Sequence, residues 1–318
     1  MSEKKIIAVV GATGAQGSGL VRAIAEDRNG EFTARALTRK ASSDKAKELA
    51  ALGAEIVEAD IDDPASVRSA FKGAYGAFCV TFFWDHLSAE KEIAQARTMA
   101  AAARDTSLQH VIWSTLEDTR KLVPLSDDRM PTLKEKYKVP HFDGKGEADA
   151  FFTEMGVPTT FLLTSFYWDN FIHFGMGPAR ADGATLSLTL PMGDAPLPGI
   201  AAEDIGRCAY GIFKAGPAEF AGKRVGIAGE HATGASMAAA FSSLLGEDVV
   251  YNAIDPAVYR SFGFPGADDM GNMFQYKRDF NEQFRAPRDV ARSRALNPKL
   301  RSFAQWLQEN RAAFVPAR

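Results

Sequence analysis

Residues 6–17 decide the fold of this 318-residue chain and read Ile6-Ile7-Ala8-Val9-Val10-Gly11-Ala12-Thr13-Gly14-Ala15-Gln16-Gly17. The apolar run 6–10 is typical of a fully buried strand, and the residues after the glycines predict a helix. Glycines between a strand and a helix let backbone N–H groups approach a pyrophosphate, where the helix dipole favours negative charge. A tight turn alone would also use glycines, but this context favours a dinucleotide site. The predicted contacts are Gly11, Thr13, Gly14, Ala15, Gln16 and Gly17.

The alternation of strand and helix continues as far as residue 164. A helix that starts at Asp63-Pro64 has an N-cap residue followed by proline at its first position. Strands separated by helices need crossover connections, so we expect an α/β fold with a Rossmann-like doubly wound parallel sheet. Ligands of such sheets bind at the carboxyl ends of the strands. The predicted strands are 32–38, 55–59, 77–81, 110–114 and 159–163, and the predicted helices include 43–52, 88–104 and 142–155.

The pattern changes after residue 164. Aromatic residues gather at 166–174, and a less regular helical pattern follows residue 249. These features predict a dinucleotide-binding Rossmann domain at 1–164 and a smaller α/β C-terminal domain at 165–318, which holds the substrate or a partner. Segments around 200–230 are expected to return to the first domain.

The end of the second strand indicates which dinucleotide is bound. An NAD site usually has an acidic residue about 20 positions after the glycines, but this chain has Thr38-Arg39-Lys40 there. The planar fork of Arg39 pairs well with a phosphate, so NADP(H) is the predicted cofactor, with Lys40 beside it. A solvated loop face is the alternative for both. Further contacts are predicted after the third and fourth strands, where ordinary loop roles are the alternative: Asp60, Ile61, Thr81 and Phe82.

Several motifs together resemble the NmrA-like family of the atypical short-chain dehydrogenase/reductase superfamily. They are the glycine loop, Arg39, His141-Phe142-Asp143-Gly144-Lys145-Gly146-Glu147 and Phe166-Tyr167-x-x-Asn170-Phe171. Later motifs, Gly263-Phe264-Pro265-Gly266-Ala267 and Asn272-Met273-Phe274, are similar to the animal NmrA-like redox-sensor proteins. The resemblance spans essentially the whole chain.

The resemblance implies catalysis by a serine, a tyrosine and a lysine, with the tyrosine four residues before the lysine on one helix. Lys145 matches the lysine and Ser114 the serine, but His141 stands at the tyrosine position. Histidine suits general acid work near neutral pH. The alternative for His141 is a helix cap after Pro140, and the alternative for Lys145 is a solvated helical lysine. Tyr137 and Tyr167 could also supply a proton.

Aromatic residues after the sixth strand suggest a substrate pocket. The predicted pocket residues are Tyr167, Trp168 and Asn170, although aromatic clusters are more often core than ligand site. Asp204 is most simply a helix N-cap. Neither cysteine has a Cys or His partner at ligand spacing, so no metal site is expected.

Composition excludes several functional classes. The net charge of −3 argues against a general nucleic-acid or anionic-membrane surface, which would need clustered Lys and Arg. Two cysteines imply no disulfide framework, and Cys79 in an apolar run is expected to be buried and inert. No apolar run approaches the roughly 18 residues needed to cross a bilayer, so we expect a cytoplasmic protein.

Two hypotheses of function follow from the sequence. The first is an NADPH-dependent reductase of a small carbonyl, enone, imine or quinone-like substrate. The second is a non-catalytic sensor of NADPH against NADP⁺ that regulates a protein partner, which rests on the missing tyrosine and the late motifs. A sensor needs two conformations with different affinity for the nucleotide. The resemblance also makes a homodimer plausible.

Overall fold

A parallel sheet forms the centre of the computed structural model, which describes residues 3–180 and 185–315. Its seven strands follow the order β11-β6-β5-β4-β1-β2-β3, and neighbouring strands are parallel. The order reverses between β1 and β4, which is the switch point of a doubly wound sheet. This confirms the predicted fold class. The strands are β1 (Lys5–Val9), β2 (Phe32–Thr38), β3 (Glu55–Glu58), β4 (Gly76–Cys79), β5 (His110–Thr115), β6 (Thr159–Leu163) and β11 (Arg224–Gly226).

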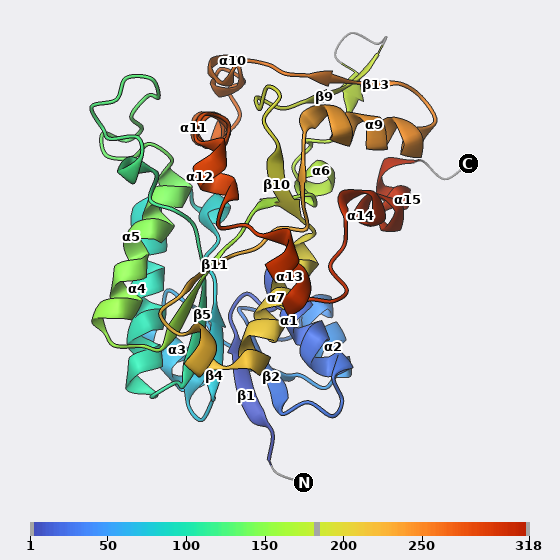
Figure 1. Cartoon of the computed structure of the whole chain (residues 1–318). Helices are drawn as coiled ribbons and strands as arrows, with labels where there is room; N and C mark the ends of the chain where they lie inside the picture. The colour runs from blue at the N-terminus through green and yellow to red at the C-terminus, as the bar shows by residue number, and fades with distance from the viewer. Residues whose placement is uncertain (1–2, 181–184, 316–318) are drawn as a thin grey trace.

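Helices cover both faces of this sheet, with α3, α4 and α5 on one side and α1, α2 and α7 on the other (Figure 1). Successive side chains of β1 enter opposite layers: Ile7 and Val9 join one buried cluster, Ala8 the other. This is why the strand is apolar throughout. The helices are α1 (Ala15–Glu26), α2 (Asp44–Ala51), α3 (Pro64–Phe71), α4 (Ala89–Asp105), α5 (Pro140–Glu154) and α7 (Ala202–Ala215).

Most predicted element bounds agree with the structure to within two residues. The strands at 32–38 and 159–163 have the predicted ends. Asp63 caps α3 as predicted, because its carboxylate accepts a hydrogen bond from the N–H of Ala65. α5 begins at Pro140, two residues earlier than predicted, and this places His141 in its first turn. Cys79 is fully buried as expected, and burial raises the pKa of its thiol.

A second lobe lies above the carboxyl ends of the sheet (Figure 1). Two small sheets, β12-β10-β7 and β13-β9-β8, share its core with helices and many aromatic side chains. Its elements are β7 (Phe166–Tyr167), α6 (Asn170–His173), β8 (Ala179–Arg180), β9 (Leu186–Thr189), β10 (Leu197–Ile200), β12 (Glu230–Ala232), α9 (Gly234–Leu245), β13 (Val249–Asn252), α10 (Pro256–Arg260), α11 (Ala267–Asp279) and α12 (Asn281–Arg285). The other helices are the 3-10 turns η1 (Phe83–Asp85) and η2 (Thr119–Lys121), α8 (Pro217–Phe220), α13 (Val290–Leu296), α14 (Phe303–Glu309) and α15 (Arg311–Phe314).

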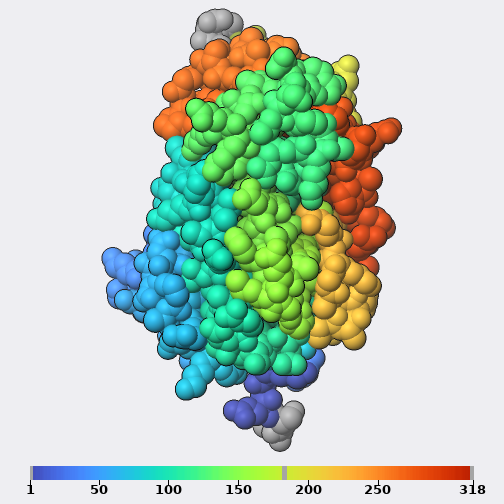
Figure 2. Space-filling model, turned by 90° about the vertical axis from the view of Figure 1, so that its left-hand side faces the viewer, coloured from blue at the N-terminus to red at the C-terminus, as the bar shows by residue number. Residues whose placement is uncertain are grey.

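The second lobe is joined to the long segment 116–139 that follows β5. Figure 2 shows the orange α10–α11 region against this green segment at the top of the molecule. Asn272 donates hydrogen bonds to the carbonyls of Pro131 and Lys138, at 2.9 and 2.5 Å. These bonds fix α11 to the segment that follows β5.

Residues after 200 return to the first lobe. β11 extends the main sheet beside β6, and α7 packs on α1. The two helices approach backbone to backbone: a Cβ on Gly19 would lie 2.2 Å from the carbonyl oxygen of Glu203, and one on Gly206 2.2 Å from the nitrogen of Leu20. Only glycine permits this approach. Within the described residues, no helix is long and apolar enough to span a membrane.

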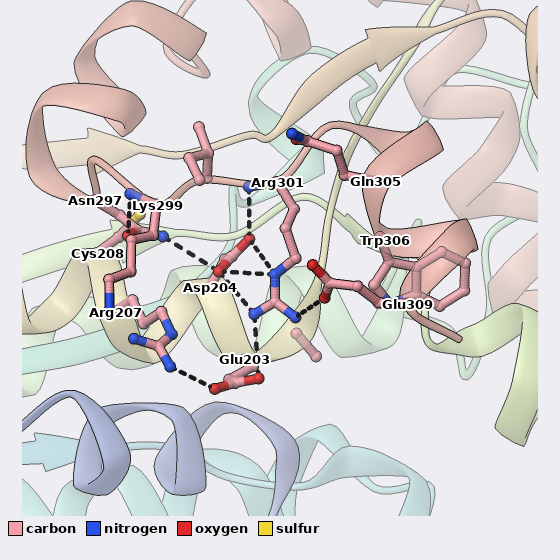
Figure 3. A network of polar contacts seen from close by, with 12 residues as sticks. Glu203, Asp204, Arg207, Cys208, Asn297, Lys299, Arg301, Gln305, Trp306 and Glu309 are labelled. Atoms are coloured by element: carbon pink, nitrogen blue, oxygen red, sulfur yellow. Dashed lines mark hydrogen bonds and ion pairs between the residues drawn. The ribbon is translucent and has the colours of Figure 1, made fainter. Parts of the chain in front are cut away.

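An ion-pair network joins α7 to the C-terminal segment (Figure 3). The N-cap role predicted for Asp204 is wrong, because Ala201 is the N-cap and Asp204 lies within α7. The carboxylate of Asp204 is fully buried and accepts hydrogen bonds from the backbone N–H and guanidinium of Arg301, both at 3.0 Å, and from Asn297 at 3.2 Å. Arg301 also binds Glu203.

Candidate functional site

The glycine loop after β1 forms a cradle free of side chains. Gly11 has φ of +63°, and a Cβ on Gly17 would lie 2.4 Å from the carbonyl oxygen of Gly11. Among the described residues, no side chain caps the N-terminus of α1, and its first turn contains no acidic residue. Free N–H groups at a helix N-terminus favour an anion. The loop therefore fits the pyrophosphate of a dinucleotide.

Basic side chains follow β2 at the rim of this cradle. Arg39 and Lys40 are both exposed, and a guanidinium nitrogen of Arg39 lies 3.3 Å from a carboxylate oxygen of Asp85 in η1. Asp60, after β3, makes local contacts: its carboxylate accepts from the N–H of Asp62, in an Asx turn. Ile61 packs at the edge of the α3–α4 core.

Lys145 of α5 is held by two polar side chains from neighbouring elements. Its Nζ lies 2.6 Å from Oγ1 of Thr81 and 3.0 Å from a carboxylate oxygen of Glu92 in α4. Thr81 in turn donates to Glu92 at 2.6 Å. The side chain of Lys145 is only 11% exposed, so it is not a solvated lysine. Glu92 was missed from the sequence, where it looks like one of many charges on a long helix.

Gln16 connects the glycine loop to the ends of β5 and β7. Its amide donates to the hydroxyl of Tyr167 at 2.7 Å and accepts from that of Ser114 at 2.8 Å. Burial raises the pKa of Tyr167 to about 12, so its hydroxyl stays protonated at neutral pH. The structure thus brings Ser114 and Tyr167 together through a loop residue, but Ser114 is not part of the pocket wall.

His141 is paired with a carboxylate from the second lobe. Its Nδ1 lies 2.5 Å from Oδ1 of Asp269, and its backbone N–H donates to Oδ2 of the same residue at 3.1 Å. The ring packs against Trp84, with centroids 5.1 Å apart. His141 lies within α5 and is not its cap. Because Nδ1 is engaged by Asp269, Nε2 is the nitrogen left for other partners.

A pocket of about 150 Å³ lies between the lobes. Its walls include Gln16, Thr81, Phe82, His141, Lys145, Tyr167, Asn170 and Lys277. Trp168 was wrongly predicted here. Its indole is 1% exposed and packs against Phe303 and Trp306, because the chain turns directly after β7 and the ring enters the core of the second lobe.

Outside this pocket, the described residues form no metal site, but they do form a further groove. No group of three or more His, Cys, Asp or Glu residues in the described ranges could hold a metal ion. A larger groove of about 710 Å³ lies between α1, β2 and α2, at the opposite end from the glycine loop, and is lined by residues such as Lys4, Arg22 and Thr33. None of the predicted site residues lies there.

Comparison with known proteins adds relatives and solved structures. The profile of the NmrA-like family matches residues 3–307. The NmrA-like family domain-containing oxidoreductase cpsB of Aspergillus campestris is 28% identical over 295 residues, which cover 86% of this chain and 83% of the relative. The oxidoreductase malD of Malbranchea aurantiaca, of the same description, is 30% identical over 221 residues, 66% of this chain and 64% of the relative.

Two solved structures share the fold over nearly the whole chain. NmrA, a negative transcriptional regulator, was solved in complex with NADP and matches with a TM-score of 0.78 at 24% identity, covering 97% of this chain and 95% of its own. The triphenylmethane reductase of Citrobacter sp., complexed with NADP(H), matches with a TM-score of 0.74 at 17% identity, covering 96% and 99%. One fold therefore serves both a regulator and a reductase.

Proposed function

The chain belongs to the NmrA-like family, and from this premise we propose that it is an NADPH-dependent reductase of a small carbonyl, enone, imine or quinone-like acceptor. One observation carries the proposal: His141, which is paired with Asp269, and Lys145, which is held by Glu92, line the same largely apolar pocket beside the glycine loop. A site that only binds a nucleotide does not require an oriented acid–base group facing a cavity. The names of the relatives as oxidoreductases agree with this.

The residues present fit an NADP(H) cofactor. The N–H groups of the glycine loop would hold the pyrophosphate, and Arg39 with Lys40 the 2′-phosphate. Lys145 would hold the nicotinamide ribose, because its ammonium is fixed at the pocket wall by Thr81 and Glu92. NADPH, when bound, supplies the hydride.

His141 supplies the proton in the proposed reaction. In a carbonyl or imine the carbon gains the hydride, and its oxygen or nitrogen takes the proton from Nε2 of the imidazolium. In an enone or quinone the hydride adds at the conjugated carbon, and the carbonyl oxygen takes that proton. Asp269, bound to Nδ1, fixes the ring orientation. His141 then takes up a proton from solvent, so the enzyme returns to its starting protonation state.

Arg39→Ala is expected to weaken NADPH and NADP⁺ binding by about tenfold to a hundredfold, since a charge-assisted contact to phosphate is lost. NADH and NAD⁺, which lack the 2′-phosphate, should be unaffected. Isothermal titration of the four nucleotides measures this, with Arg292→Ala on exposed α13 as the matched control. Equal losses for all four nucleotides would contradict the 2′-phosphate role.

His141→Gln is expected to lower kcat by about 10²-fold or more, because the proton donor is lost while nucleotide affinity stays unchanged. Asp269→Asn should lower kcat, because the His141 ring loses the carboxylate that orients it. His141→Tyr should retain or raise activity, since it restores the family's tyrosine. NADPH oxidation with a quinone and carbonyl panel measures all three, beside His173→Gln at an exposed position. Unchanged turnover in His141→Gln would exclude the proposed donor.

A second candidate function is the nucleotide sensor, favoured by the position of η1. Asp85 of η1 contacts Arg39, and Trp84 of η1 packs on His141. A bound dinucleotide would therefore lie near this short turn twice: with its 2′-phosphate at Arg39 and with its nicotinamide at His141. Absence of turnover over the whole panel, together with a change of oligomeric state in light scattering on adding NADPH, would favour this function over catalysis.

A further inference from the structure

Lys277 is a buried lysine in the wall of the same pocket, two turns after Asp269 on α11. The residue is 3% exposed and lines the cavity together with His141 and Lys145. Among the residues that the structure describes, the sulfur of Met273, at 3.2 Å, is the only hydrogen-bond partner of its Nζ. Four phenylalanine rings surround the amine with centroids 5.3 to 5.8 Å away: Phe142, Phe166, Phe274 and Phe284.

No carboxylate of the described residues lies within ion-pair distance of Lys277. Arg288 and Glu117 are the charged groups that influence the pKa of Lys277. They bind each other through two contacts of 2.5 and 3.0 Å. Glu117 is therefore already paired. Burial, with a contribution from Arg288, lowers the pKa of Lys277 to about 7. Ring faces attract a cation but replace its lost hydration only in part.

A charged amine in this position destabilises the fold unless a partner supplies a counter-charge or hydrogen-bond acceptors. A buried ammonium needs a counter-charge or hydrogen-bond acceptors, and a methionine or leucine would pack against four phenyl rings without that cost. Lys277 is one of the residues that line the pocket. A molecule that binds in this pocket is therefore the candidate for the missing partner of the amine.

We propose that Lys277 binds an acidic oxygen of the substrate, so that the site takes flat aromatic acceptors that carry a negative charge. This inference rests on the proposed reductase function and names its substrate class. The remaining walls support a ring: Phe82, Trp84 and Phe174 are large aromatic residues that line the same cavity. The charged head binds at Lys277, and the ring lies among apolar side chains.

Two quinones of similar size test this inference: 2-hydroxy-1,4-naphthoquinone, which is an anion at neutral pH, and the uncharged 2-methyl-1,4-naphthoquinone. Their binding to the full chain is measured calorimetrically with NADP⁺ present, so that no reduction occurs. The wild type should bind the anion about tenfold or more tightly than Lys277→Met does. Affinity for the uncharged quinone should be the same in both, which shows that the variant is folded. Lys45→Met on exposed α2 is the matched control.

Proton uptake gives a readout that a structural role of Lys277 would not produce. At pH 8 most of the free Lys277 is neutral, because its pKa is about 7. A bound anion raises that pKa, so the wild type should take up protons on binding, and Lys277→Met should not. Titrations in buffers of different ionisation enthalpy measure the uptake. Equal anion affinity in both proteins, weak anion binding to the wild type, or no uptake would overturn the inference. Loss of the proposed reductase function would appear separately, as no NADPH turnover with either quinone.

Discussion

Lys145→Met is expected to lower kcat/KM for NADPH-dependent reduction by about 10²- to 10³-fold. The variant removes the positive charge fixed at the pocket wall, and a fixed charge at a reacting centre contributes about this much to the rate. The same change leaves the carboxylate of Glu92, which is 1% exposed, without its cation. Removing one partner of a buried ion pair costs about 3–5 kcal/mol. Lys145→Met should therefore also be less stable.

A double variant separates these two effects. In Lys145→Met/Glu92→Gln no buried charge is left uncompensated, so most of the stability should return. The catalytic loss should remain, because the ammonium is still absent. Urea denaturation measures the first quantity and initial rates of NADPH oxidation measure the second. Activity that recovers with stability in the double variant would show that Lys145 acts only on the fold.

Arg301→Met is expected to lower the free energy of unfolding by about 3–5 kcal/mol, the same range as the loss expected for Lys145→Met. Asp204 is fully buried, and Arg301 supplies both its counter-charge and a backbone hydrogen bond (Figure 3). The variant leaves that carboxylate uncompensated in the interior. Adding Asp204→Asn to Arg301→Met should restore part of the loss, because the buried charge is then absent.

The measurement is urea denaturation followed by circular dichroism. Arg292→Met, at an exposed position of α13, should change the unfolding free energy by less than about 0.5 kcal/mol and serves as the control. If both arginine variants behaved alike, the network in Figure 3 would contribute no more than a surface contact.

The sequence patterns of neighbouring residues predicted the strands and helices of the first lobe well. An apolar run such as 6–10 and a glycine loop are features of neighbouring residues, so they identify strands, turns and the helix that follows. The predicted Lys145 and His141 both line the observed pocket, because one helix places residues four apart on one face. Whether they act in catalysis stays a prediction, as do the homodimer and the cytoplasmic location.

The partners of these residues could not be predicted. Asp269 meets His141 across 128 residues of sequence, and it follows another aspartate in a helix start, where acidic residues are common anyway. The partner of Asp204 could not be predicted either. Its position near a helix start suggested a cap, and the local sequence contains no sign of its contact with Arg301. Trp168 was misplaced for a related reason: the sequence shows an aromatic cluster but not which side of the chain each ring faces.

The glycine contact between α1 and α7 has a consequence for how the protein is made. The helix that starts at the nucleotide loop is covered by a helix that emerges from the ribosome about 180 residues later, and β11 completes the sheet later still. Such distant pairings are entropically expensive to form early, and they slow folding. A nascent chain ending near residue 164 would lack α7, which packs on α1, and would leave the edge of β6 without its partner β11. Chaperone binding during synthesis is therefore expected to persist until the whole sheet can close.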